Sequence, residues 1–448
     1  MEKNKRNRLT SAQVIILGFM SVILLGALLL CLPIATQSGE RASFVDALFT
    51  ATSSVCVTGL VVHNTATFWS GFGQVVIMLL IQIGGMGVVT VAVTFAMISG
   101  RRIGLMQRST MQEAISAHHV GGIVKFTGFI LKFTFLIEFI GAALLACAFC
   151  SEFGLARGLW YGLFHSVSAF CNAGFDILGI DAPFVSLTAY ADSPLVNLTI
   201  MGLIVVGGIG FLTWQDIKTN RWHLRAYRMQ SKIILTTTAL LIALPTLFFF
   251  IFEFRGGEWA NASVGDRLLA SAFQAVTPRT AGFNTVDLAA MSEAGQSVMI
   301  FLMLIGGAPG STAGGMKITT AAVVLLSTLA VFRRRETIRC FGRRIEEGVL
   351  RDALAILLMY ILLFFFGAMA ISLLEDLPMM ACLYETASAI GTVGLTLGIT
   401  PQLGVVSQLI LISLMFFGRV GGLTLIFAAL SGTRQYAARL PKEKITVG

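Results

Sequence analysis

Four short stretches of the chain share a pattern: a glycine preceded by two residues, each of which is small, polar or β-branched. The glycines lie at intervals of 115, 108 and 112 residues. The residues that carry the pattern are Val57, Thr58, Gly59; Asn172, Ala173, Gly174; Thr280, Ala281, Gly282; and Thr392, Val393, Gly394. Glycine adopts positive φ without steric cost, which lets neighbouring carbonyls converge. Four such strands around an axis would form a ring of carbonyl oxygens that replaces the water around a monovalent cation.

Each glycine ends a half-apolar stretch that predicts a short helix followed by a re-entrant turn. Three of the stretches carry a serine six residues before the glycine, at Ser53, Ser168 and Ser388, and the third stretch has Val276 there. Such backbone is tolerated at membrane depth only where it is buried in protein or lines a water-filled cavity. The C-terminus of each short helix would favour a cation. Without a ring of carboxylates, Ca²⁺ and Mg²⁺ are disfavoured. The competing interpretation, ordinary packing tripeptides, does not explain the even spacing.

The composition indicates a membrane protein. Of the 448 residues, 56% are hydrophobic, only 12% are charged and 46 are glycine. One soluble core cannot hide so much apolar surface, whereas runs of about 20 apolar residues can each cross a bilayer. The net charge of +9 lies mainly in short loops, so it indicates membrane topology and no nucleic-acid partner. Cys147 and Cys150 form a C-x-x-C pair inside an apolar run, and buried small residues are the favoured interpretation over metal or redox use.

The chain divides into four units, each with a span, a re-entrant hairpin, a second span and a basic exit. We predict an all-α polytopic membrane protein whose parallel repeats surround a central pore with pseudo-fourfold symmetry. The units are 1–118, 119–231, 232–349 and 350–448, the last including a C-terminal tail. Predicted spans cover 14–32, 72–98, 126–150, 195–214, 233–252, 296–332, 350–374 and 405–430, and predicted hairpins cover 44–62, 160–177, 268–285 and 381–398.

Lysine and arginine predict the orientation. The N-terminus, the three loops between units and the tail hold 24 of the 32 basic residues, while the segments around the hairpins hold five. By the positive-inside rule, both termini and every loop between units face the cytoplasm. The hairpins then all enter from outside. We therefore expect a multi-pass protein of the cytoplasmic (inner) membrane.

The second span of unit three is the longest. Its 37 residues exceed one straight crossing. Five glycines and a proline within 306–316 predict two half-helices joined by a loop that acts as a gate. The gate residues are Gly306, Gly307, Pro309, Gly310, Ser311, Thr312, Gly314, Gly315 and Lys317. The glycine clusters at 84–87, 207–210 and 418–422 are interpreted instead as close helix packing.

Arg419 stands in the middle of an apolar span, too far from either end to reach water. We expect it to line the cavity below the carbonyl ring and to hold the 306–316 loop across the path through loop carbonyls. The alternative is a structural ion pair with Glu138 on another span.

These features together resemble the Trk/Ktr/HKT superfamily of potassium transporters. The motifs that carry the resemblance are the four hairpins ending in glycine, the stretch GGAPGSTAGG and the arginine of the fourth unit. The resemblance covers the whole chain and is strongest to the membrane subunits of bacterial Ktr systems, the KtrB group, which lack two extra leading helices. It implies potassium uptake, with K⁺ bound at the carbonyls of the four tripeptides as a selectivity filter, and gating by the loop and Arg419.

The resemblance also implies partners. Family members are homodimers on a cytoplasmic octameric ring of nucleotide-binding RCK subunits (KtrA-like), so the nucleotide binds only the partner, and Na⁺ is a candidate activator. The basic loops fit an acidic partner surface, although membrane topology alone would also explain them. Arg279, beside the third tripeptide, leaves the selectivity open, because a cation there repels the passing ion unless it is turned away.

Two other functions compete. A Na⁺- or H⁺-coupled secondary transporter also uses broken helices at mid-membrane, but it usually has inverted repeats. An intramembrane enzyme would need a nucleophile and a base, for which only His165 and Cys171 lie close in sequence, with no third orienting group. We therefore expect a transporter without enzymatic activity.

Overall fold

The computed structural model describes residues 10–99, 104–114, 122–180, 182–422 and 424. Within these residues the regular secondary structure is helical, apart from one antiparallel hairpin of two-residue strands and one isolated bridge between Thr36 and Trp69. The helices are α1 (Ser11–Leu30), α2 (Phe44–Cys56), α3 (Thr65–Phe68), α4 (Gly71–Met86), α5 (Val88–Ile98), α6 (Leu105–Ala114), α7 (Ile123–Phe153), α8 (Leu155–Phe170), α9 (Pro194–Gly208), α10 (Phe211–Asn220), α11 (Met229–Phe248), α12 (Val264–Val276), α13 (Glu293–Leu304), α14 (Ile318–Phe332), α15 (Glu347–Glu375), α16 (Met379–Gly391) and α17 (Val405–Val420), and the strands are β1 (Arg339–Cys340) and β2 (Arg343–Arg344).

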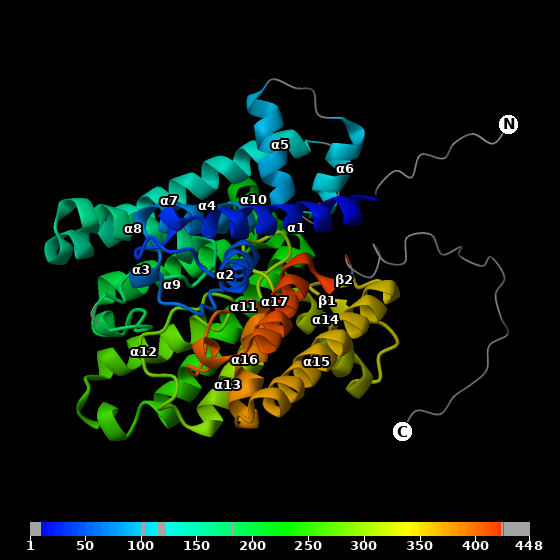
Figure 1. The fold of residues 1–448 in the computed structure, drawn as a ribbon. Helices are drawn as coiled ribbons and strands as arrows, with labels where there is room; N and C mark the ends of the chain where they lie inside the picture. The colour runs from blue at the N-terminus through cyan, green and yellow to red at the C-terminus, as the bar shows by residue number, and fades with distance from the viewer. Residues whose placement is uncertain (1–9, 100–103, 115–121, 181, 423, 425–448) are drawn as a thin grey trace.

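The helices repeat one plan four times, as the predicted fold class requires. A long helix (α1, α7, α11 or α15) is followed by a short one (α2, α8, α12 or α16) and then by a returning segment (Figure 1). The returning segments are α4 with α5, α9 with α10, α13 with α14, and α17. The predicted boundary between the first two units and the predicted tail lie outside the described residues.

The long helices are the outer layer of the molecule. Each is apolar over more than 18 residues, and only 17–33% of its most apolar window is buried inside the protein. A helix that is apolar on its exposed side as well as its buried side suits a lipid environment. The chain therefore has the surface of a multi-pass membrane protein.

Two of the short helices begin at strong local signals. Ser43 caps α2 and Ser263 caps α12 by accepting from a backbone N–H, and an aspartate lies in the first turn of each. A serine cap satisfies an otherwise unpaired donor, and an acidic first turn complements the positive end of the helix. These signals explain why short helices of mixed polarity form at the predicted places.

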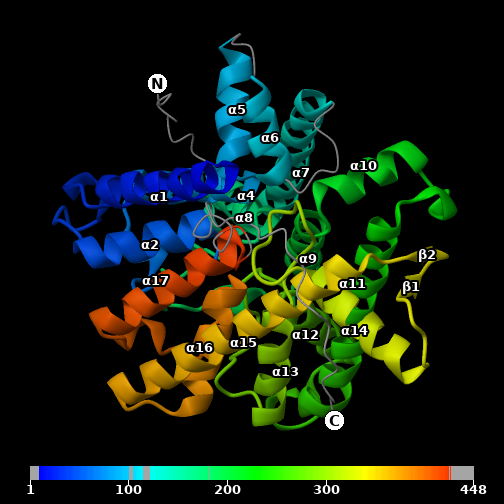
Figure 2. The ribbon, with the colours of Figure 1, turned by 90° about the vertical axis from the view of Figure 1, so that its right-hand side faces the viewer.

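The short helices connect the four units in a closed circle through their contacts with neighbouring units. Each packs against the long helix of its own unit and against the returning helix of the unit before it: α8 against α4, α12 against α9, α16 against α13, and α2 against α17. The last contact joins the end of the chain to its beginning. In Figure 2 this contact is visible as α2 lying beside α17.

The returning segments of the first two units differ from the prediction. The predicted spans 72–98 and 195–214 are bent in the middle, because α4 and α5 meet at 94° and α9 and α10 meet at 93°. The bends occur at Gly87 and Gly210, whose φ values of 86° and 92° only glycine adopts readily. The interpretation of these glycine clusters as packing alone is therefore incomplete: they also end a helix.

The count of spans changes accordingly. Within the described residues, four helices are long and apolar enough to cross a membrane, or six segments if each bent pair counts as one. In the third unit α13 ends at Leu304 and α14 begins at Ile318, so a non-helical loop interrupts the long segment. In the fourth unit α17 ends at Val420 before Gly421, with φ 89°.

Candidate functional site

The structure brings the four motif glycines together in a ring. A methyl group placed on Gly59 would lie 3.2 Å from Cα of Gly174, and one on Gly174 would lie 2.8 Å from Cα of Gly282. A methyl group on Gly282 would lie 3.3 Å from Cα of Gly394, and one on Gly394 would lie 2.9 Å from Cα of Gly59. The ring therefore closes in sequence order, and no side chain fits between its members.

The backbone of the four strands has the same unusual conformation. Two residues before each glycine, φ is positive: 59° at Val57, 61° at Asn172, 69° at Thr280 and 52° at Thr392. The glycines themselves have φ of 95°, 67°, 82° and 96°. Positive φ in β-branched residues is strained, and such strain persists only where the surroundings enforce it, commonly at functional sites.

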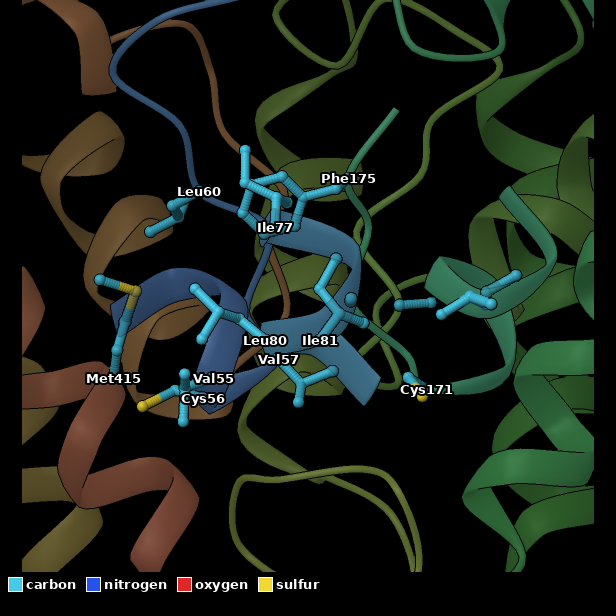
Figure 3. Close-up of a cluster of buried hydrophobic side chains, with 14 of the residues drawn as sticks. Val55, Cys56, Val57, Leu60, Ile77, Leu80, Ile81, Cys171, Phe175 and Met415 are labelled. Carbon is cyan, nitrogen blue, oxygen red and sulfur yellow. The ribbon is translucent and has the colours of Figure 1, made fainter. Parts of the chain in front are cut away.

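The carbonyl of the residue before each glycine faces the neighbouring strand. Its oxygen is the atom nearest to a methyl group built on the adjacent glycine: Ala173 for Gly59, Ala281 for Gly174, Val393 for Gly282 and Thr58 for Gly394. In the first strand, the side chains of Val57 and Leu60 are buried in the hydrophobic core. Figure 3 shows Val57 beside Leu80 and Ile81 in this cluster. The ring is thus lined by backbone oxygens.

Hydroxyl groups on the short helices hold the strands. Ser53 accepts from the Gly59 N–H at 3.0 Å, and Ser388 accepts from the Gly394 N–H at 2.9 Å. Ser168 instead donates to the Phe175 carbonyl at 2.8 Å. The third unit has no serine at this position, and there Thr277 donates to the Phe283 carbonyl. The sequence pattern missed Thr277 because it is displaced by one residue.

Arg279 is turned away from the ring. Its side chain is only 5% exposed, and its Nη2 lies 3.4 Å from the hydroxyl of Thr238 on α11. The guanidinium therefore lies behind the third strand, which is the arrangement that avoids direct repulsion of an ion on the axis.

The loop between α13 and α14 lies directly beneath the strands. It contains all of the predicted gate residues from Gly306 to Gly315. The Thr312 hydroxyl donates to the Phe170 carbonyl at 3.0 Å, at the base of the second strand. Gly314 faces the side chain of Thr392, and Gly315 lies so close to the Gly391 carbonyl that an added methyl group would sit 2.7 Å from its oxygen. The loop thus contacts the second and fourth strands.

Arg419 connects this loop to the end of α4 in the first unit. Its Nη1 donates to the Thr312 carbonyl, and its Nη2 donates to the carbonyls of Gly84 and Gly85 at the end of α4. The expected loop-carbonyl partner is therefore present. The alternative pair with Glu138 is wrong, because that carboxylate accepts from Gln82 at 2.9 Å and has no contact with Arg419 among the described residues. Lys317 Nζ donates to the Ala313 carbonyl at 2.8 Å.

A cavity of about 330 Å³ is lined in part by this loop and by none of the residues of the four strands. Its lining includes Phe19, Glu113, Gly310, Lys317, Tyr360 and Arg419. The loop therefore contacts the strands and also lines the cavity, and Arg419 lines the cavity while it donates to the Thr312 carbonyl.

The other candidate groups do not assemble. His165 Nδ1 contacts the Tyr161 carbonyl at 2.7 Å, while the Cys171 thiol contacts Glu138 at 3.8 Å, so the two side chains do not form a nucleophile and base pair. All seven cysteines are free. In the described part of the chain no cluster of three metal-binding side chains occurs.

Comparisons with known proteins agree with this architecture. The TrkH family profile, described as cation transport protein, matches residues 3–435. The chain is 40% identical to the potassium/sodium uptake protein NtpJ of Enterococcus hirae, over all of this chain and 99% of that one. It is also 40% identical to the Ktr system potassium uptake protein B of Bacillus subtilis, covering 98% and 97% of the two chains.

A solved structure supports the fold independently of close sequence similarity. The potassium transporter TrkH from Vibrio parahaemolyticus superposes with a TM-score of 0.72, covering 95% of this chain and 86% of that one at 19% identity. The family match and the full-length relatives establish the identity of the chain: it belongs to the TrkH family of cation transport proteins.

Proposed function

We propose that this chain takes up potassium across the cytoplasmic membrane, through a selectivity filter formed by the four glycine-centred strands. The observation that carries the proposal is the closed ring of Gly59, Gly174, Gly282 and Gly394, lined by backbone carbonyls and free of side chains. Carbonyl oxygens at such a ring replace the water of a dehydrated alkali cation. The printed names of the relatives, potassium/sodium uptake and potassium uptake, fit this substrate.

In this proposal the loop between α13 and α14 is the gate that controls passage of the cation. It contacts the strands and lines part of the cavity, and Thr312 makes contacts with two other units through its N–H, carbonyl and hydroxyl. A cation that leaves the ring must pass this loop. Arg419 holds the loop closed, and its release opens the path.

The arrangement favours a channel-like path over coupled secondary transport. Inverted repeats around a site at their interface are typical of many secondary transporters. Here four units of the same plan form one ring around one axis. Uptake of K⁺ that is independent of imposed Na⁺ and H⁺ gradients would support the channel-like mechanism, and strict dependence on either gradient would support the alternative.

The assembly belongs to the same proposal. Two copies of the chain would sit on a cytoplasmic ring of nucleotide-binding RCK subunits, with both termini and the basic loops facing that ring. Supporting features are the resemblance to Ktr membrane subunits and the exposed basic residues at 333–335. Nucleotide would then act through the partner, and Na⁺ is a candidate activator.

The test is uptake of K⁺, Rb⁺ and Na⁺ in cells that lack their own potassium systems. Gly59→Ser forces a side chain against the Ala173 carbonyl, so it should lower K⁺ over Na⁺ discrimination. Gly202→Ser on α9 is the matched control, because nothing lies within 4 Å of an added Cβ there. A Gly59→Ser variant as selective as the parent would remove the ring from the mechanism.

A further inference from the structure

A buried carboxylate lies beside the fourth filter strand. Glu385 is in the short helix α16, nine residues before Gly394, and its side chain is 0% exposed. No Lys, Arg or His pairs with it in the described part of the chain. An ionisable residue inside a membrane domain is costly and is normally kept for a function.

The partners of Glu385 are two hydroxyl groups on the chain that leaves the strand. We call residues 395–400 the exit segment. One carboxylate oxygen accepts from the Thr396 hydroxyl at 2.7 Å, and the other accepts from the Thr400 hydroxyl. Thr396 in turn accepts from the Gly398 N–H at 3.0 Å. The carboxylate thus joins two points of the exit segment to the short helix.

This contact complements the one made by Ser388. Ser388 binds the Gly394 N–H at 2.9 Å and so positions the strand itself. Glu385 lies one turn earlier in α16 and positions the residues that follow. Leu395 and Thr400 are buried, so the exit segment is part of the packed structure and not a free loop. Side chains of one helix therefore hold the fourth strand at its glycine and hold the exit segment that follows it.

The other three units have no carboxylate at this position, although Asp46 of α2 contacts His63 at 3.0 Å and Gln274 of α12 lies 3.4 Å from the Thr285 hydroxyl. The residues nine positions before their glycines are Thr50, His165 and Phe273. His165 is hydrogen-bonded to its own helix at the Tyr161 carbonyl, and phenylalanine offers no polar group. Among the residues at this position, a carboxylate that binds two hydroxyl groups beyond the glycine occurs in the fourth unit, where Gly394 closes the ring against Gly59.

We propose that Glu385 is a positioning residue of the filter, which holds the fourth strand through Thr396 and Thr400 and thereby sets K⁺ over Na⁺ discrimination. A carbonyl ring distinguishes ions by the placement and number of its oxygens. Placement within about 0.5 Å requires support from surrounding side chains. This inference rests on the proposed function, since it concerns selectivity at the same ring.

The experiment measures the ratio of K⁺ to Na⁺ uptake, together with KM and the maximal rate, in cells lacking other potassium systems. Glu385→Gln and Thr400→Val each disturb a hydrogen bond to a buried carboxyl group, and each should lower the ratio by about tenfold. Thr400→Ser retains the hydroxyl and should restore the parental ratio. The matched control is Thr386→Val, because that hydroxyl donates to the Cys382 carbonyl of its own helix at 2.9 Å.

The outcomes separate the two proposals. Parental ratios in Glu385→Gln and Thr400→Val would overturn the role of Glu385, and so would an equal loss in Thr386→Val. If Glu385→Gln does not accumulate in the membrane, the comparison of Thr400→Val with Thr400→Ser decides. A parent chain that takes up no potassium contradicts the proposed function instead.

Discussion

Removal of the Arg419 guanidinium tests whether the loop between α13 and α14 is a gate. Arg419 makes one hydrogen bond to the loop, at the Thr312 carbonyl, and its other bonds reach Gly84 and Gly85 in the first unit. It therefore acts as a clamp between the loop and α4. In Arg419→Ala the loop loses that clamp, while the strands keep their serine and threonine anchors.

The size of the effect follows from the single bond to the loop. A hydrogen bond to a charged group contributes about 2 kcal/mol, which corresponds to about 30-fold in an equilibrium between closed and open loops. If the closed state dominates in the parent, the maximal rate of K⁺ uptake rises by up to that factor. KM should change little, because no filter residue is altered. Arg419→Lys should give an intermediate rate, since an ammonium group cannot reach both sides as a planar fork does.

The assay is initial K⁺ uptake at matched protein levels in the membrane, with a variant lacking Gly310–Gly314 measured alongside. Both changes should raise the rate. Unchanged or lower uptake in both variants would show that the loop does not obstruct the path, and the gate would have to be placed elsewhere.

Two further changes probe the backbone on which the site depends. Asn172→Val places a β-branched residue at φ 61° and removes the amide contact to Thr280. We therefore expect the variant to lose about 2 kcal/mol of stability, which would lower its thermal unfolding temperature. Asn172→Gly should lose less stability, because glycine adopts this φ readily. Gly210→Ala opposes φ 92° at the bend and brings a methyl group within 2.9 Å of the Pro309 carbonyl, so it should unfold at a lower temperature than Gly202→Ala, and equal temperatures would contradict this.

Much of the fold was predictable because it depends on local and repeated patterns. Long apolar runs predict the outer helices, and the four glycine motifs at similar spacing predict short helices that turn back. Capping serines such as Ser43 and Ser263 act within one turn, so their effect is visible in the sequence. The interruption near Pro309 follows from excess length and from the missing N–H of proline.

Other features depended on which residues meet across the ring. The glycines at 84–87 and 207–210 fit both close packing and a bend, and both uses occur: Gly84 and Gly207 pack against carbonyls near the ends of the short helices α2 and α8, while Gly87 and Gly210 turn the chain. The choice between Glu138 and loop carbonyls as partners of Arg419 also required the tertiary structure. Each option was locally acceptable, and only the packing of α17 against its neighbours distinguishes them.

The sequence alone determined which residues form each glycine-centred strand and that the motif occurs four times. Both follow from the chain itself, because the spacing of the motifs can be read from the sequence and glycine adopts positive φ without steric cost. Only the tertiary structure decided that the four strands close into a ring, that Arg279 points away from it, and that Glu385 meets Thr396 and Thr400. The ring depends on contacts between units that lie about 110 residues apart in the sequence. The directions of the Arg279 and Glu385 side chains depend on the path of the backbone and on the packing around them.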